Sequence, residues 1–251
     1  MVKGLDIFEK YFAEYADQYV LIGGAACDII FSKNDAQFRA TRDLDMVLII
    51  EALKPEFVEQ FWRFVIDADY RHRVASTGDP QFYRFDKPGT EGFPKMIELF
   101  SRMQFELKEL NGLSPIHIDD EVSSLSAILL DDDYYQILLE GKIVEQGLSV
   151  LRPEYLILFK AKACLDLKAR KERGEQVDSS NMKKHKNDIL RIVVEMVLER
   201  PNRLPDLIIK DIEQFLALLS DDPFDANLLK GYGLKEVFYT QNDGTIGVEK
   251  I

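Results

Sequence analysis

The stretch Tyr19-Val-Leu-Ile-Gly-Gly-Ala-Ala-Cys-Asp-Ile-Ile-Phe31 contains one predicted strand and the helix predicted to follow it. Its first apolar run halts at Gly23-Gly24, after which small and apolar residues continue at helical spacing. Beyond a polar loop, Asp43-Leu-Asp45 opens a second apolar run that reaches Ile50. The order strand, glycine pair, helix and strand predicts an α/β protein with a mixed sheet.

The two aspartates that open the second run form a candidate metal site. Side chains alternate along a strand, so Asp43 and Asp45 point to one face while Leu44 points into the core. Two carboxylates held this close repel each other unless a cation lies between them. Hard oxygen ligands of this kind suit Mg²⁺ or Mn²⁺.

The glycine pair forms a candidate phosphate site. Gly23 and Gly24 lack Cβ atoms, so their backbone can approach a ligand closely, and the helix that starts there presents unpaired N–H groups. A phosphate site facing a metal site is what phosphoryl or nucleotidyl transfer requires, because the metal neutralises charge on the phosphate oxygens.

These residues carry a resemblance to a known family. Gly23-Gly24 followed by Arg39-x-Thr41-x-Asp43-Leu-Asp45 resembles the signature of the polymerase-β-type nucleotidyltransferase superfamily. The long gap, with Arg and Thr before the aspartates, is similar to the AbiEii-like branch, which includes toxin nucleotidyltransferases. The resemblance implies a nucleotidyltransferase-fold mixed sheet with helices followed by a helical region, an NTP substrate and two divalent ions, Mg²⁺ or Mn²⁺. For a toxin of this branch it also implies an antitoxin protein as partner.

Members of the superfamily usually add a third carboxylate from a nearby strand. Glu98 is the candidate here, because Ile97 and Leu99 point to the opposite side of its strand. Glutamate stands where aspartate is commoner in the family. The alternative is a glutamate on a strand face exposed to water.

Two segments near residues 158–167 and 184–191 also resemble the AbiEii-like branch, which has a lysine motif on one helix and an aspartate motif on the next. By spacing, the lysine maps to Lys162, with Lys160 as its rival, and would neutralise triphosphate charge. Asp188 maps to the aspartate, where it would hold the lysine or contact nucleotide. The alternative is an interhelical ion pair that only fixes packing.

The chain has 251 residues, 46% of them hydrophobic and 30% charged, as is typical of a globular protein. We predict an α/β domain over residues 1–151 and a helical region over residues 152–251. Predicted helices cover residues 5–17, 55–67, 154–171, 181–199 and 205–220. Predicted strands cover residues 19–22, 43–50, 82–85, 95–100, 116–118, 127–130, 134–139 and 142–145. The strands 82–85 and 95–100 should form a hairpin, Asp131-Asp-Asp133 should be a hairpin turn, and residues 241–244 have the composition of a turn.

The composition also bounds the setting of the protein. No apolar run approaches the roughly 20 residues that a membrane span needs, and the N-terminus lacks the apolar core of a signal peptide. The two cysteines, Cys27 and Cys164, suggest no disulfide framework. We therefore expect a cytoplasmic protein that does not associate with a membrane.

The net charge of −12 argues against indiscriminate binding of nucleic acid. Residues 160–191 nevertheless carry a local charge of +5, which leaves −17 on the rest of the chain. This basic segment predicts either a site for an anion or a solvated helix face.

Together these residues predict a metal-dependent nucleotidyltransferase that moves a nucleoside monophosphate from NTP to an acceptor hydroxyl and releases pyrophosphate. Asp43 and Asp45 would hold the metal, while Glu98 would ligate it or act as general base. The acceptor stays open among an RNA end, a protein and a small molecule. The alternatives are an inactive nucleotide-binding or regulatory module of the same fold, and a metal-dependent phosphohydrolase.

Overall fold

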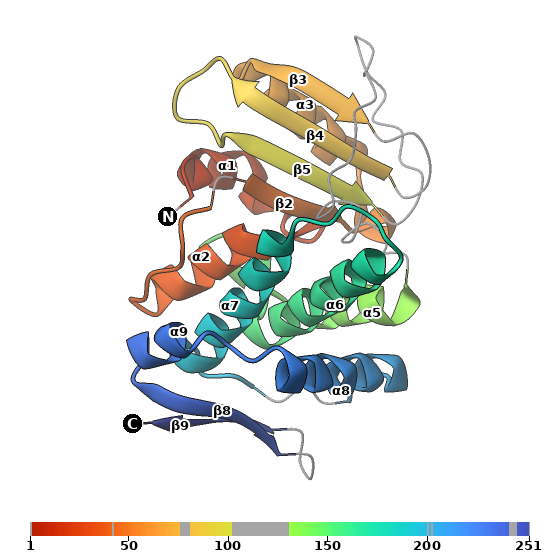
Figure 1. Cartoon of the computed structure of the whole chain (residues 1–251). Helices are drawn as coiled ribbons and strands as arrows, with labels where there is room; N and C mark the ends of the chain where they lie inside the picture. The colour runs from red at the N-terminus through yellow and green to blue at the C-terminus, as the bar shows by residue number, and fades with distance from the viewer. Residues whose placement is uncertain are drawn as a thin grey trace. The chain divides into compact units, whose positions relative to one another are not determined.

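The computed structural model describes residues 2–41, 43–75, 81–101, 131–199, 201, 203–240 and 245–250. The chain divides into two compact units, Met1–Leu156 and Ile157–Ile251. The first unit contains a seven-stranded mixed sheet with helices, and the helices α6 to α9 follow it in the chain (Figure 1). The predicted fold class, a mixed α/β sheet followed by helices, is confirmed.

The sheet has the strand order β3-β4-β5-β2-β1-β7-β6. Its strands are β1 Tyr19–Ile22, β2 Asp43–Leu48, β3 Tyr70–Ala75, β4 Gln81–Pro88, β5 Met96–Ser101, β6 Lys142–Glu145 and β7 Leu148–Leu151. Strand β1 pairs with β2 antiparallel and with β7 parallel, and β2 pairs with β5 parallel. All four residues of β1 are buried, as expected of a continuous apolar run in the interior of a sheet.

The first unit contains α1 Leu5–Phe12, α2 Gly23–Lys33, α3 Pro55–Asp67 and α5 Asp132–Glu140. The short 3-10 turns η1 Ala13–Tyr15 and η2 Ile50–Ala52 extend α1 and follow β2. The predicted helix over residues 5–17 is therefore α1 with its 3-10 extension, and the predicted helix over 55–67 is α3. Pro55 occupies the first turn of α3, where a missing N–H costs nothing.

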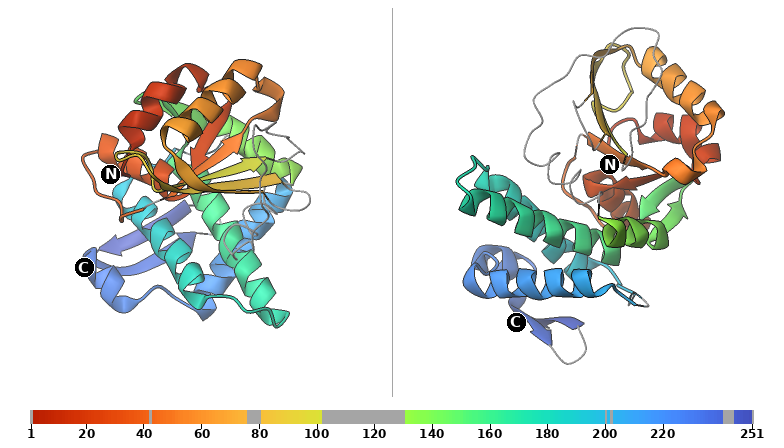
Figure 2. Two further views of the ribbon diagram at one scale, coloured as in Figure 1. Left: turned by 90° about the horizontal axis from the view of Figure 1, so that it is seen from above. Right: turned by 90° about the vertical axis from the view of Figure 1, so that its right-hand side faces the viewer.

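An aromatic layer joins α1 and α3 to one face of the sheet, and Figure 2 shows both helices on the same side of these strands. Tyr19 of β1 meets Phe8 of α1 edge-on at 5.8 Å between ring centroids. On β4, Phe85 meets Phe61 at 5.3 Å and Trp62, the only tryptophan of the chain, at 6.0 Å. Residues that alternate with these aromatic positions face the other side of the sheet.

The segment 134–139, predicted as a strand, is wrong: it belongs to helix α5. The prediction of a hairpin turn at residues 131–133 is wrong for the same reason. The Asp131 side chain accepts hydrogen bonds from the backbone N–H groups of Asp133 at 2.9 Å and Tyr134 at 3.2 Å, which caps the helix. The buried residues of α5 are Tyr134, Tyr135, Ile137 and Leu138. That spacing follows a helix period, which a short apolar run conceals.

Other predictions for the first unit fare better. The hairpin of β4 and β5 is confirmed, with Arg84 opposite Glu98 in its register. Strand β6 has the predicted bounds, and β7, its antiparallel partner, was not predicted. The strands predicted at residues 116–118 and 127–130 and the turn predicted at 241–244 lie outside the described residues.

In the second part of the chain, the helices are α6 Pro153–Glu172, α7 Ser179–Glu195, α8 Asp206–Asp221 and α9 Ala226–Gly231. The first three confirm the predicted helices of this region. Helix α9 and the antiparallel pair β8 Leu234–Thr240 and β9 Thr245–Lys250 were not predicted. Among the helices within the described ranges, none combines the length and apolar character needed to cross a membrane.

Replacing Asp131 by alanine should lower the free energy of unfolding by about 1 kcal/mol, because α5 loses its N-cap. Asp131→Asn, which keeps an acceptor oxygen, is the matched control and should cost clearly less. Urea denaturation of the three proteins measures the difference. Equal stability of Asp131→Ala and wild type would contradict the capping role.

Candidate functional site

The glycine pair lies against two polar side chains at the start of α2. Gly23 has a φ of +64°, and a Cβ atom on it would lie 2.0 Å from Oδ2 of Asp45. A Cβ on Gly24 would lie 2.6 Å from Oγ1 of Thr41. Glycine is therefore needed twice, once for its backbone conformation and twice for space. The result is a carboxylate and a hydroxyl beside the first turn of a helix, whose N–H groups favour negative charge.

Four strands of the sheet align one row of residues with this helix start. In the registers, Ile22 of β1 is opposite Asp45 of β2, Asp45 is opposite Glu98 of β5, and Glu98 is opposite Arg84 of β4. Neighbouring strands lie roughly 5 Å apart, so adjacent side chains of this row can interact directly. Asp43 lies two residues along β2, on the same face and opposite Met96. The sheet thus brings Asp43, Asp45 and Glu98 to one face, as their alternation predicted.

Glu98 is buried, with 7% of its surface exposed, so the alternative of a water-exposed glutamate is wrong. Its Oε1 atom accepts hydrogen bonds from Nε of Arg84 at 2.8 Å and from Nη2 of Arg84 at 2.5 Å. Burial and the neighbouring Asp45 carboxylate raise the pKa of Glu98 to about 9, against the opposing effect of Arg84. In the absence of a metal, therefore, Glu98 holds a proton at neutral pH.

The carboxylates fit a divalent cation in chemistry but are not gathered into one set. Asp43 and Asp45 are half-buried oxygen donors two residues apart on one strand face, as Mg²⁺ or Mn²⁺ requires. Within the described part of the chain, no three His, Cys, Asp or Glu side chains come together closely enough to hold a metal ion. Glu98 is engaged by Arg84 instead. The pair Asp43 and Asp45 fits a cation better than the full trio does.

Sequence reasoning missed two residues on this face. Arg84 is the partner of Glu98, and Asp86, two residues further along β4, has a buried Oδ1 atom that accepts no hydrogen bond from the described residues. A signal for Arg84 existed, since it is a lone cation in the strand Phe82-Tyr-Arg-Phe85. It could not be used, because the register of the hairpin was not fixed by the sequence.

The lysine and aspartate motifs lie in the second unit and form different pairs from the expected one. Nζ of Lys160 lies 2.8 Å from Oδ2 of Asp188, and both side chains are almost fully buried. Nζ of Lys162 lies 2.8 Å from Oδ2 of Asp211 on α8, and 28% of the Lys162 side chain is exposed. Positions two apart on a helix face different neighbours. Helix α6 therefore offers Lys160 to α7 and Lys162 to α8, and Asp188 holds the rival lysine.

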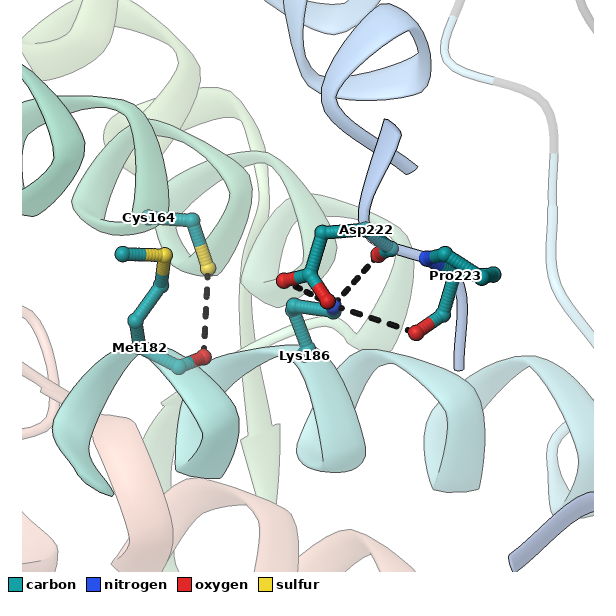
Figure 3. Close-up of polar contacts among 5 residues, drawn as sticks. All are labelled: Cys164, Met182, Lys186, Asp222 and Pro223. Carbon is teal, nitrogen blue, oxygen red and sulfur yellow. Dashed lines mark hydrogen bonds and ion pairs between the residues drawn. The ribbon is translucent and has the colours of Figure 1, made fainter. Parts of the chain in front are cut away.

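A third lysine ties α7 to the end of α8 (Figure 3). Nζ of Lys186 donates to the carbonyl oxygen of Asp222 at 2.5 Å, to its Oδ2 at 2.6 Å and to the carbonyl oxygen of Pro223 at 3.4 Å. Lys186 thus satisfies carbonyl groups just past the end of α8, which helix ends leave without partners. Nearby, burial raises the pKa of the Cys164 thiol to about 12, and this thiol donates to the carbonyl oxygen of Met182 at 3.7 Å.

Much of the charge of the basic segment is neutralised within the segment or by α8. Besides the three buried or half-buried lysines, Arg170 and Arg173 both pair with Glu175, at 2.7 Å and 2.9 Å. Lys168 lies 4.0 Å from Glu172 one turn along α6. These pairs favour a structural role for a large part of residues 160–191.

Comparison with known proteins gives one structural likeness. An antigenic nucleotidyltransferase-like protein from Paracoccidioides brasiliensis aligns over 91% of this chain and 94% of its own, with 15% sequence identity and a TM-score of 0.41. No family model and no curated protein matches the chain. At so low an identity and TM-score, activity has to be argued from the residues of the chain itself.

Gly23→Ala should destabilise the protein by about 1–3 kcal/mol from its left-handed backbone alone, and further through the clash with Asp45. Gly174→Ala is the matched control, because Gly174 has a φ of +84° with no atom within 4 Å of an added Cβ. Denaturant unfolding should place Gly23→Ala below Gly174→Ala. In the double variant Gly23→Ala/Asp45→Ala the two costs should add up to less than their sum. Equal losses for the two glycines would contradict the close approach of Asp45.

Lys160→Met should cost about 3–5 kcal/mol, because it leaves the Asp188 carboxylate buried without its counter-charge. The double variant Lys160→Met/Asp188→Leu should regain most of that loss. Lys162→Met, on the more exposed pair, should cost about 1 kcal/mol or less. Thermal and denaturant unfolding measure all three, and a larger loss for Lys162→Met would reverse the assignment of the structural lysine.

Proposed function

We propose that the chain is a nucleotidyltransferase that uses Mg²⁺ or Mn²⁺ to transfer a nucleoside monophosphate from an NTP to an acceptor hydroxyl, with release of pyrophosphate. The observation that carries the proposal is the position of Asp45. It lies beside the first residue of α2 and, in register, next to Glu98, so that a phosphate-binding helix end and metal-binding carboxylates share one place on the sheet.

Gly23 and Gly24 would bind the β- and γ-phosphates. The first N–H groups of α2 have no partner within the helix, and the positive end of the helix dipole favours an anion there. Gly23 leaves no room for a side chain, so the backbone itself would form the surface that the phosphates meet. Thr41, whose hydroxyl lies against Gly24, could donate a further hydrogen bond.

Asp43 and Asp45 would hold the cation. When bound, the metal would draw the phosphate oxygens toward the aspartates and neutralise charge that develops on them. Asp45 also lies at the helix end, so the same carboxylate would meet metal and nucleotide together. Glu98 would either complete the site for a second ion or take the proton of the acceptor hydroxyl.

For the second unit, the resemblance supports Lys162 and Asp188 as nucleotide-binding residues. The Lys162 side chain is partly exposed and could exchange Asp211 for a phosphate, as a flexible cation can. Asp188 would act indirectly, because it holds the buried Lys160. NTP binding should then weaken in Lys162→Ala and the fold should weaken in Lys160→Met.

The Arg39-x-Thr41-x-Asp43 spacing also supports a toxin of the AbiEii-like kind, with an antitoxin protein as its partner. Arg39 stacks on Phe38 at 5.3 Å from the ring centroid, while Arg42 lies outside the described residues. Growth arrest on expression of the wild type, absent for Asp43→Asn/Asp45→Asn, would support this role. The candidate acceptors are an RNA end, a protein and a small molecule.

The deciding experiment incubates the protein with Mg²⁺ or Mn²⁺, NTPs labelled on the α-phosphate, and pools of RNA, protein and small molecules. We expect label to enter one pool with release of pyrophosphate, and Asp43→Asn/Asp45→Asn to abolish the transfer. The cation should also raise the melting temperature of the wild type by mass action and not that of the double variant.

Each alternative gives its own result. Orthophosphate released without incorporation of label would identify a phosphohydrolase. NTP binding without either product would identify an inactive nucleotide-binding module. Equal stabilisation by metal of wild type and Asp43→Asn/Asp45→Asn would exclude the two aspartates as the metal ligands.

A further inference from the structure

We propose that Arg84 is a positioning residue that holds Glu98 by one oxygen and supplies the second positive charge of the carboxylate row, so that the site takes one divalent cation, on Asp43 and Asp45, rather than two. The inference rests on the proposed function, and it concerns how many ions that site holds. It departs from the two ions that the family resemblance implies.

The first argument is the geometry of the pair. Two N–H donors of Arg84 converge on the same atom, Oε1 of Glu98, at 2.8 Å and 2.5 Å. A carboxylate oxygen that already accepts two charge-assisted hydrogen bonds has little remaining capacity to bind a metal ion. The contact also fixes the orientation of the Glu98 carboxyl group, because Arg84 approaches from a neighbouring strand in direct register.

The second argument is burial. The Arg84 and Glu98 side chains are 16% and 10% exposed, so neither is well solvated by water. An arginine is always charged and cannot lose its proton to make room for a metal. A guanidinium one strand away from Asp45 therefore repels any cation that approaches Glu98, and this repulsion is strong where water is scarce.

The third argument is the contrast with the aspartates. Asp43 and Asp45 are half-exposed and lie two residues apart on the strand beyond Glu98. No guanidinium occupies the register positions beside them, since Met96 is opposite Asp43 and Glu98 is opposite Asp45. A cation is thus favoured on the aspartates and disfavoured at the Arg84 side of Glu98.

The test counts Mn²⁺ ions bound by the full-length protein, using calorimetry together with the loss of the free Mn²⁺ signal in electron paramagnetic resonance. We expect one ion for the wild type, one for Glu98→Gln, and none for Asp43→Asn/Asp45→Asn. Arg84→Met should gain a second ion, because Glu98 is released. Arg84→Lys, which keeps the charge, should remain at one, and Arg84→Met/Glu98→Gln should return to one.

Two ions on the wild type, falling to one in Glu98→Gln, would overturn the proposal, and so would loss of the single ion in Glu98→Gln. This comparison needs no Arg84 variant, so it holds even if Arg84→Met does not fold. A folded Arg84→Met that still binds one ion would also overturn it. Binding of Mn²⁺ by Asp43→Asn/Asp45→Asn as by the wild type would instead contradict the proposed function, whatever the Arg84 variants do.

Discussion

Asp45 and Glu98 lie opposite each other on two parallel strands, and two acidic groups cannot stay there without a proton or a positive charge close by. The rest of the site follows from this constraint. Arg84 reaches Glu98 from one side, and from the other side the backbone of Gly23 admits Asp45 to the positive end of α2. The site is therefore arranged to hold negative charge next to a place where a phosphate group could also bind.

The second unit meets the same constraint with lysines. Lys160 and Lys162 leave α6 in different directions because they are two residues apart, and each finds an aspartate on a different helix. Lys186 joins the third side by satisfying the end of α8. Buried ion pairs add little net stability, but they disfavour every arrangement that separates the partners. These pairs thus specify how the three helices of this unit meet, rather than how strongly they hold together.

The sequence was informative wherever the signal was local. The glycine pair, the alternation around Asp43 and Asp45, and the proline at the start of α3 each act within a few residues, and the corresponding elements were predicted. Helix α5 was missed because its apolar residues fit a strand and a helix over so short a run, and only the cap at Asp131 distinguishes them. Arg84, and the exchange of Lys162 for Lys160 as the partner of Asp188, depend on register and helix rotation. Both are properties of tertiary packing, which no local pattern records.

The aromatic layer has a consequence for observing this protein in solution. Trp62 packs edge-on against Phe85, whose neighbour along β4 is Arg84 on the other face of the sheet. Because the chain has a single tryptophan, its fluorescence arises from this one position. The emission of the unlabelled protein therefore monitors the strand that carries Arg84, from the side that no nucleotide or metal ion would touch.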